Sequence, residues 1–113
     1  MFFIGIDVAK RSHQAAVTDI SGNVIVKPFN FKNSSDGFTK FLSAVESNAI
    51  KKNDCIIGLE STGHYWYPLY FFLIENGFDV KVFNPIQTAA FREITIRKVK
   101  NDNLDSLLIA DFT

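Results

Sequence analysis

The sequence predicts an α/β fold: a mixed five-stranded sheet whose first three strands are antiparallel, with helices on both faces. Three observations support this prediction. Three segments of strand character open the chain before any helical pattern appears. Helical and strand patterns then alternate, as in sheets with crossover helices. A hydrophobic fraction of 47% and a charged fraction of 21% over 113 residues are typical of one globular domain, which we expect to span 1–113.

The three N-terminal strands are expected at 2–8, 13–18 and 24–31. The first is an apolar run that closes on Asp7, and the third is rich in Val, Ile and Phe. A polar turn at 21–23 joins the second strand to the third. The three strands should therefore form an antiparallel meander.

A helix and a buried strand are expected next. Ser35 or Asp36 is the predicted N-cap of the helix. Apolar residues recur at helical spacing after it, namely Phe38, Phe41, Leu42, Val45 and Ala49. The segment 55–59 is continuously apolar, which is the pattern of a strand covered on both faces.

A second helix and a fifth strand follow a turn at 60–63. Pro68 is tolerated in the first turn of this helix, and Gly77 is expected to end it. The segment 78–83 then has strand character.

The remaining sequence predicts a short helix from 84 to about 91, a basic loop over 94–101 and a helix over 102–112. The complete order of strands and helices is that of ribonuclease-H-like domains. No glycine cap follows the last helix, so we expect the chain to be part of a longer protein.

Charges are segregated along the chain, although the formal net charge is zero. The overall balance therefore does not indicate a nucleic-acid-binding protein. A cationic segment near the C-terminal end does, and we predict that it contacts DNA phosphates through Arg92, Arg97, Lys98 and Lys100. Lys10 and Arg11 carry no such prediction.

The sequence also bears on compartment. No basic leader precedes an apolar run, and no segment approaches the roughly 20 apolar residues that span a bilayer. We therefore expect a cytoplasmic protein without a membrane partner. Cys55 is the only cysteine, which excludes an internal disulfide and a cysteine zinc cluster, and its apolar neighbours predict that it is buried.

Four carboxylates are candidates for a metal site. Asp7 and Glu60 each end an apolar strand, where sheets with crossover helices place ligand sites. Asp102 and Asp105 are three apart on a predicted helix and share one face. Clustered carboxylates repel one another and take up protons or divalent cations. Oxygen ligands suit Mg²⁺ or Mn²⁺, and two such ions about 4 Å apart support phosphoryl transfer on nucleic acid.

Each acid also has a purely structural interpretation. Asp7 is then a turn residue and Glu60 a solvated acid. Asp102 is then a helix N-cap, and Asp105 interacts favourably with the helix dipole. Spacing alone leaves both interpretations open.

Short motifs spread over the chain resemble one family. They are Gly5-Ile6-Asp7-Val8-Ala9-Lys10, Leu59-Glu60-Ser61-Thr62-Gly63-His64-Tyr65, Asn84-Pro85, Lys100-Asn101-Asp102-Asn103-Leu104-Asp105-Ser106 and Ile109-Ala110. Over essentially its whole length the sequence resembles the Piv/MooV-type DNA invertases and related insertion-sequence transposases. The resemblance implies a RuvC-like DEDD domain whose catalytic, metal-binding acids are Asp7, Glu60, Asp102 and Asp105.

The same resemblance implies a recombinase that acts on DNA with Mg²⁺ or Mn²⁺, forms a homo-oligomer through the full-length protein and, in some members, uses a guide RNA. The family also has a C-terminal domain, with a serine implicated in strand exchange, that is absent from this sequence. We therefore expect that the chain alone does not recombine DNA. Asn101 stands where the family usually has Thr.

Two other functions compete with this interpretation. Actin-like and sugar-kinase-type ATPases share the fold type, but they need a glycine-rich phosphate turn after the first strand, and residues 8–10 contain no glycine. A non-catalytic nucleic-acid-binding or assembly module would use the aromatic segment 65–70 as an interface. His64 is close to Glu60 in sequence, but a lone histidine is more often packed or solvent-facing than catalytic.

Overall fold

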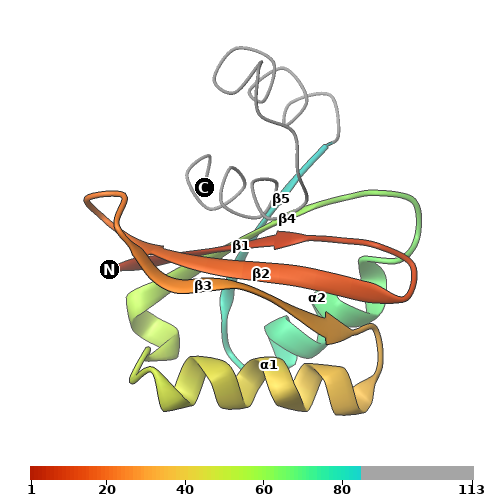
Figure 1. Ribbon diagram of the computed structural model, residues 1–113. Coiled ribbons are helices and arrows are strands. Elements are labelled where there is room, and N and C mark those ends of the chain that lie inside the picture. Colours follow the sequence, from red (N-terminus) through yellow and green to blue (C-terminus); the bar gives the residue numbers. More distant parts are fainter. Residues whose placement is uncertain (85–113) are drawn as a thin grey trace.

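The computed structural model describes residues 1–84. The helices and the basic loop expected beyond residue 84 lie outside the described residues. Five strands form one mixed sheet of order β3-β2-β1-β4-β5 (Figure 1). β1 (Phe2–Asp7), β2 (Ser12–Asp19) and β3 (Val24–Lys32) pair antiparallel in sequence, which confirms the predicted meander.

The second half of the sheet is parallel. β4 (Cys55–Glu60) pairs with β1, and β5 (Asp79–Phe83) pairs with β4. Parallel neighbours require crossover connections, and helices supply them. α1 (Ser35–Ser47), followed by the short 3-10 helix η1 (Lys52–Asp54), leads from β3 to β4, and α2 (Tyr67–Glu75) leads from β4 to β5.

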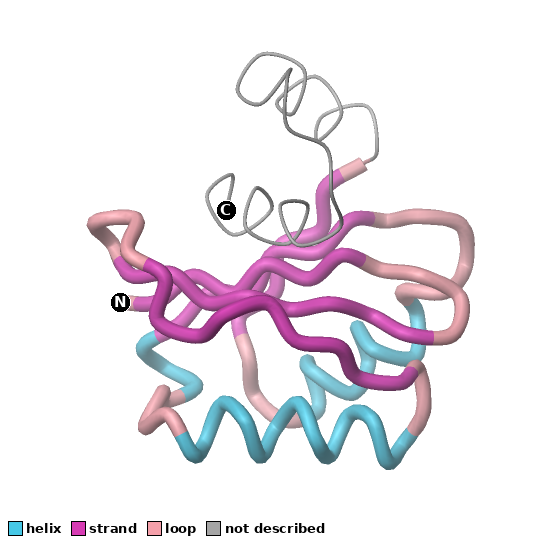
Figure 2. Tube along the Cα trace, viewed as in Figure 1, coloured by secondary structure: helices cyan, strands magenta, loops and turns pink. Residues whose placement is uncertain are grey.

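Both described helices cover the same face of the sheet (Figures 1 and 2). Side chains of a strand alternate between faces, so one set of each central strand points toward these helices. That set is continuous across the sheet because Ile4 lies opposite Val17 on one side and Ile57 on the other. Helices were expected on both faces of the sheet, and within residues 1–84 no helix covers the second face.

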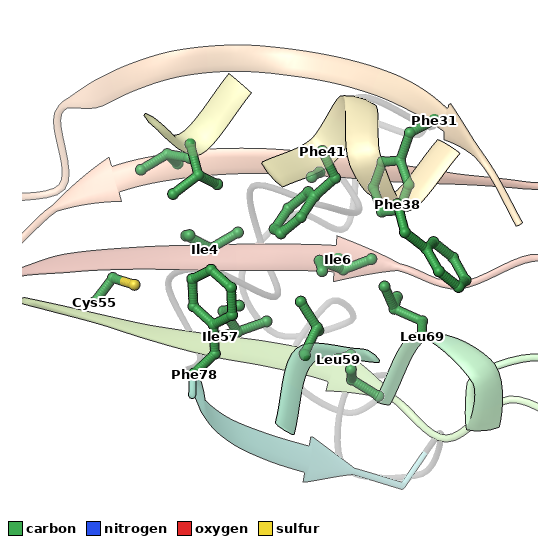
Figure 3. Close-up of a cluster of buried hydrophobic side chains, with 14 of the residues drawn as sticks. Ile4, Ile6, Phe31, Phe38, Phe41, Cys55, Ile57, Leu59, Leu69 and Phe78 are labelled. Carbon is green, nitrogen blue, oxygen red and sulfur yellow. The ribbon is translucent and has the colours of Figure 1, made fainter. Parts of the chain in front are cut away.

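The core fills the space between this face and the two helices (Figure 3). Its aromatic part is layered: the Phe31 and Phe41 ring centroids are 5.0 Å apart, and both side chains are almost completely buried. Cys55 is also buried, as predicted. Other members of the cluster are Ile4, Ile6, Ile57, Leu59, Phe38, Leu69, Leu73 and Phe78.

Helix α1 begins one residue earlier than the sequence predicted. Its N-cap is Ser34, whose Oγ accepts a hydrogen bond from the Gly37 amide at 3.2 Å, and not Ser35 or Asp36. The cap is set by the tight turn at the end of β3, where the Ser34 amide donates to the Lys32 carbonyl oxygen at 2.9 Å. At position 37 a Cβ atom would collide with the Lys32 carbonyl group, so only glycine fits.

The end of α1 also differs from the helical pattern in the sequence. Asn48 is the C-cap, and Ala49 has a φ of 57°, so Ala49 follows the helix and does not belong to its apolar face. The chain re-enters the core at Ile50. The Ile50 amide donates to the Val45 carbonyl oxygen, which closes the helix end.

Helix α2 is apolar on more than its buried side. Pro68 lies in the first turn, as predicted, and Leu69 and Leu73 are fully buried. Phe71 and Ile74 are exposed on the outer side, at 57% and 43%. No helix within residues 1–84 is long and apolar enough to cross a membrane.

Candidate functional site

Asp7 and Glu60 end neighbouring parallel strands. Asp7 is the last residue of β1 and Glu60 the last of β4. The paired register of the two strands ends with Ile6 opposite Leu59, so the next residue on each strand is one of the two acids. Adjacent strands are about 4.8 Å apart, and both acids follow a residue of the helix-covered face. They therefore share the other face of the sheet, at its carboxyl edge.

The environments of the two acids differ in exposure. Glu60 is 7% exposed, whereas Asp7 is partly exposed. A buried carboxylate requires compensation by hydrogen bonds or cations, since transfer of an isolated charge from water costs several kcal/mol. The small residues Gly5 and Gly58 lie two positions before the acids, opposite each other in the register, and leave this part of the face without large side chains.

The loop after Glu60 is anchored to the end of β5. The Ser61 amide donates to the Phe83 carbonyl oxygen at 2.8 Å, and its Oγ donates to the same oxygen at 3.2 Å. The Thr62 amide donates to the Glu60 carbonyl oxygen at 2.9 Å. These bonds fix the backbone at the point where Glu60 leaves the sheet.

The loop after Asp7 is anchored by a residue to which sequence reasoning gave no role. The Ala9 amide donates to Nδ1 of His13 at 3.1 Å. His13 is fully buried in β2, and burial lowers the pKa of its imidazole, although the nearby Asn33 side chain acts in the opposite direction. Period two in β2 places His13 on the same face as Ala15 and Val17, and this was the available signal.

The structure does not describe the other predicted site residues. Asp102 and Asp105 lie outside the described residues, as do all four cations of the predicted phosphate-binding cluster. Within residues 1–84 no three His, Cys, Asp or Glu side chains form a group that could hold a metal ion. The structure therefore brings Asp7 and Glu60 together and leaves the complete set of four acids a prediction.

His64 lies on the exposed loop before α2. Its ring stacks on Tyr67 with centroids 6.0 Å apart, and the next aromatic contact, between Trp66 and Tyr67, has centroids 4.4 Å apart. Tyr65 and Tyr67 are exposed at 39% and 45%. Exposed aromatic rings of this kind are compatible with an interface and do not identify a catalytic group.

A family model described as a transposase, of the DEDD type named for IS110, matches residues 4–113. The chain belongs to the IS110-type DEDD transposase family. The matched range contains all four predicted acids. No curated protein matches this transposase chain.

Solved structures share the fold of this transposase domain. RuvC of T. thermophilus in complex with a Holliday junction substrate has a TM-score of 0.64 and 13% identity, over 97% of this chain and 90% of that one. The fowlpox virus Holliday junction resolvase has a TM-score of 0.54 and 14% identity, over 98% and 92%. The resemblance to RuvC agrees with the predicted ribonuclease-H-like fold.

A sugar kinase has the same fold over part of its length. The ROK hexokinase from Thermus thermophilus has a TM-score of 0.57 and 19% identity, over 85% of this chain but only 38% of that one. Similarity at this identity shows the fold alone. Family membership, together with the fold, makes the transposase chain a DNA-processing domain.

Proposed function

We propose that this chain is the divalent-metal-dependent phosphoryl-transfer domain of a DNA transposase. Its ligands for Mg²⁺ or Mn²⁺, most simply two ions, are Asp7, Glu60, Asp102 and Asp105. The observation that carries the proposal is the parallel pairing of β1 with β4, which places Asp7 beside Glu60 at one edge of the sheet. Membership in a DEDD transposase family supports it.

The two described acids fit a hard cation. Carboxylate oxygens are the donors that Mg²⁺ and Mn²⁺ prefer, and strand backbones hold them more rigidly than loops do. A pair of acids on neighbouring strands gains from a cation because the cation removes their mutual repulsion. When bound, the ions would supply the positive charge that activates the attacking oxygen and stabilises the leaving oxygen of a phosphodiester.

The same edge of the sheet carries cations that suit DNA. Lys10 and Arg11 lie in the loop after Asp7, and Lys32 ends β3 at this edge, where it pairs with Ser12. All three cations are exposed. We propose that they contact DNA phosphates beside the acids, together with the basic cluster predicted at 92–100. Such contacts would make DNA binding weaken with increasing salt.

The proposal extends to the full-length protein, in which this domain would act in strand cleavage or exchange. The resolvase complex with Holliday junction DNA supports branched DNA as the substrate class. A guide RNA and a homo-oligomer formed by the full-length protein are parts of the proposal that rest on the family resemblance alone.

The decisive experiment compares two amide substitutions in the full-length transposase. Asp7→Asn removes a ligand charge while keeping the side-chain shape, and we expect transposition of a marked element to fall at least about 10²-fold. Asp79→Asn is the matched control, because Asp79 begins β5 at the opposite edge and is exposed. We expect this control to retain wild-type transposition.

DNA binding should separate from catalysis in the same preparations. Asp7→Asn should bind the element's end DNA at least as tightly as wild type, because removal of an anion reduces repulsion of phosphate. Wild-type transposition by Asp7→Asn would disprove the catalytic assignment and favour a non-catalytic assembly module.

A further inference from the structure

His13 is held in one tautomer by its surroundings. It lies in β2 between aromatic rings, with its ring centroid 5.4 Å from that of Phe31 and 6.4 Å from that of Phe38. Nδ1 accepts the Ala9 amide hydrogen bond, so this nitrogen carries no proton. A neutral imidazole has one donor and one acceptor nitrogen, and Nε2 is therefore the donor.

Asn33 joins three loops at the edge of the sheet that carries the acids. Its Nδ2 donates to the Lys10 carbonyl oxygen at 3.2 Å and to the Tyr65 carbonyl oxygen at 3.4 Å. Its backbone amide donates to the Arg11 carbonyl oxygen at 2.9 Å. The β1–β2 loop, the β4–α2 loop and the β3–α1 turn thus meet at one side chain.

Two buried side-chain atoms near this junction, one on His13 and one on Asn33, have no hydrogen-bond partner. Within the described part of the chain, Nε2 of His13 and Oδ1 of Asn33 are the buried side-chain polar atoms that lack a hydrogen-bond partner. One is a donor in the assigned tautomer and the other an acceptor, and Asn33 is close enough to raise the pKa of His13 against the effect of burial. In this structure the pair falls outside hydrogen-bond geometry.

We propose that His13 and Asn33 form a positioning unit that fixes the loops leaving Asp7 and Glu60, and so sets the metal affinity of the acid pair. The unit reaches Ala9 and Lys10 after Asp7, and Tyr65 after Glu60. It rests on the proposed function, because it acts through the metal-binding acids. Neither residue contacts reacting atoms, so each is a positioning residue.

The test measures Mn²⁺ binding by the full-length transposase, with free Mn²⁺ followed by electron paramagnetic resonance. Asn33→Ala removes both loop contacts, and His13→Gln removes the ring acceptor for the Ala9 amide. We expect each variant to bind Mn²⁺ about 10- to 100-fold more weakly, the effect typical of residues that orient metal ligands. Asn30→Ala is the matched control, since Asn30 is exposed on β3, and it should bind like wild type.

A second measurement does not depend on metal. Long-range proton–nitrogen correlation spectra of the wild-type protein should show His13 protonated at Nε2 and unprotonated at Nδ1. Observation of the other tautomer, or of the imidazolium at neutral pH, would overturn the positioning unit. Because these spectra use the wild-type protein, they test the inference even if a variant fails to fold.

The outcomes separate this inference from the proposed function. Wild-type Mn²⁺ affinity in folded Asn33→Ala and His13→Gln, together with its loss in Asp7→Asn, would overturn the positioning unit alone. Absence of Mn²⁺ binding in the wild-type protein would overturn the proposed function. It would also overturn the role of His13 and Asn33 in metal affinity. The tautomer of His13 would then test only the hydrogen bond from the Ala9 amide.

Discussion

Burial of His13 makes the stability of the fold depend on pH in a definite direction. Its pKa is lowered from 6.5, so the folded state binds fewer protons than the unfolded state just below that pH. The stabilisation is complete above about pH 6.5 and is lost as pH falls, by at most about 1.4 kcal/mol per pH unit, until the folded-state pKa is reached.

Urea denaturation at pH 7.5 and pH 5.5 tests this dependence. The wild-type free energy of unfolding should fall more over this interval than that of His13→Gln, which has no titrating group at the position, and the difference is at most about 1.4 kcal/mol. Carboxylates titrate in both proteins and cancel in the comparison. Parallel pH dependences would show that folding leaves the pKa of His13 unchanged, which would contradict its burial as a neutral ring.

Cys55 should be a poor nucleophile in the folded protein. Burial raises the pKa of its thiol to about 11, with smaller contributions from the charges of Asp54 and Asp79. The thiolate is the reactive form, and little of it exists at neutral pH. We expect alkylation at pH 7.5 to be far slower in native than in urea-denatured protein. Equal rates would mean that the β4 end of the core opens readily.

The N-cap of α1 is Ser34 and not the predicted Ser35 or Asp36. Ser34→Ala should lower the free energy of unfolding by about 1 kcal/mol, because the Gly37 amide loses its acceptor. Ser35→Ala is the matched control, and its effect should stay within about 0.5 kcal/mol. If Ser35→Ala lowered the free energy of unfolding more than Ser34→Ala in the same denaturant titration, Ser35 would be the N-cap, as the sequence predicted.

The sequence predicts the strands well because their signal is local. Period two and the apolar runs located β1 to β5 to within one residue at each end, since these patterns are read from neighbouring residues alone. It also predicted that Asp7 and Glu60 end strands. Ser34 was missed because adjacent serines have the same capping chemistry, and the turn after Lys32, a tertiary feature, selects between them.

The loop contacts of the site were not predictable in this way. Asn33 interacts with Lys10 and Tyr65, residues far from it in sequence, and no local pattern reports such contacts. Residue 33 begins a polar stretch of the sequence, 33–36, and this composition leaves its partners unspecified. His13 could have been found as a polar residue on an inward-facing position of β2.

For the whole molecule, metal binding should appear as added stability. Ligands that bind only the folded state stabilise it by about 2.7 kcal/mol at one hundred times their dissociation constant. Millimolar Mg²⁺ or Mn²⁺ should therefore raise the melting temperature of the full-length protein by several degrees, roughly 2–4 °C for each kcal/mol. Sodium chloride of equal ionic strength is the control for screening. An equal rise in Asp7→Asn would mean that the ions bind elsewhere.

The central position of β1 has a consequence for the order of folding. β1 can pair with β2 through a short connection, but its parallel partner β4 arrives only after β2, β3 and α1. Distant pairings close long loops and form slowly, so the meander is expected to form before β4 docks. Asp7 and Glu60 would then become neighbours late. Under the proposed function, a half-folded chain would therefore lack the acid pair that concentrates divalent ions, and nearby DNA would be spared until the sheet is complete.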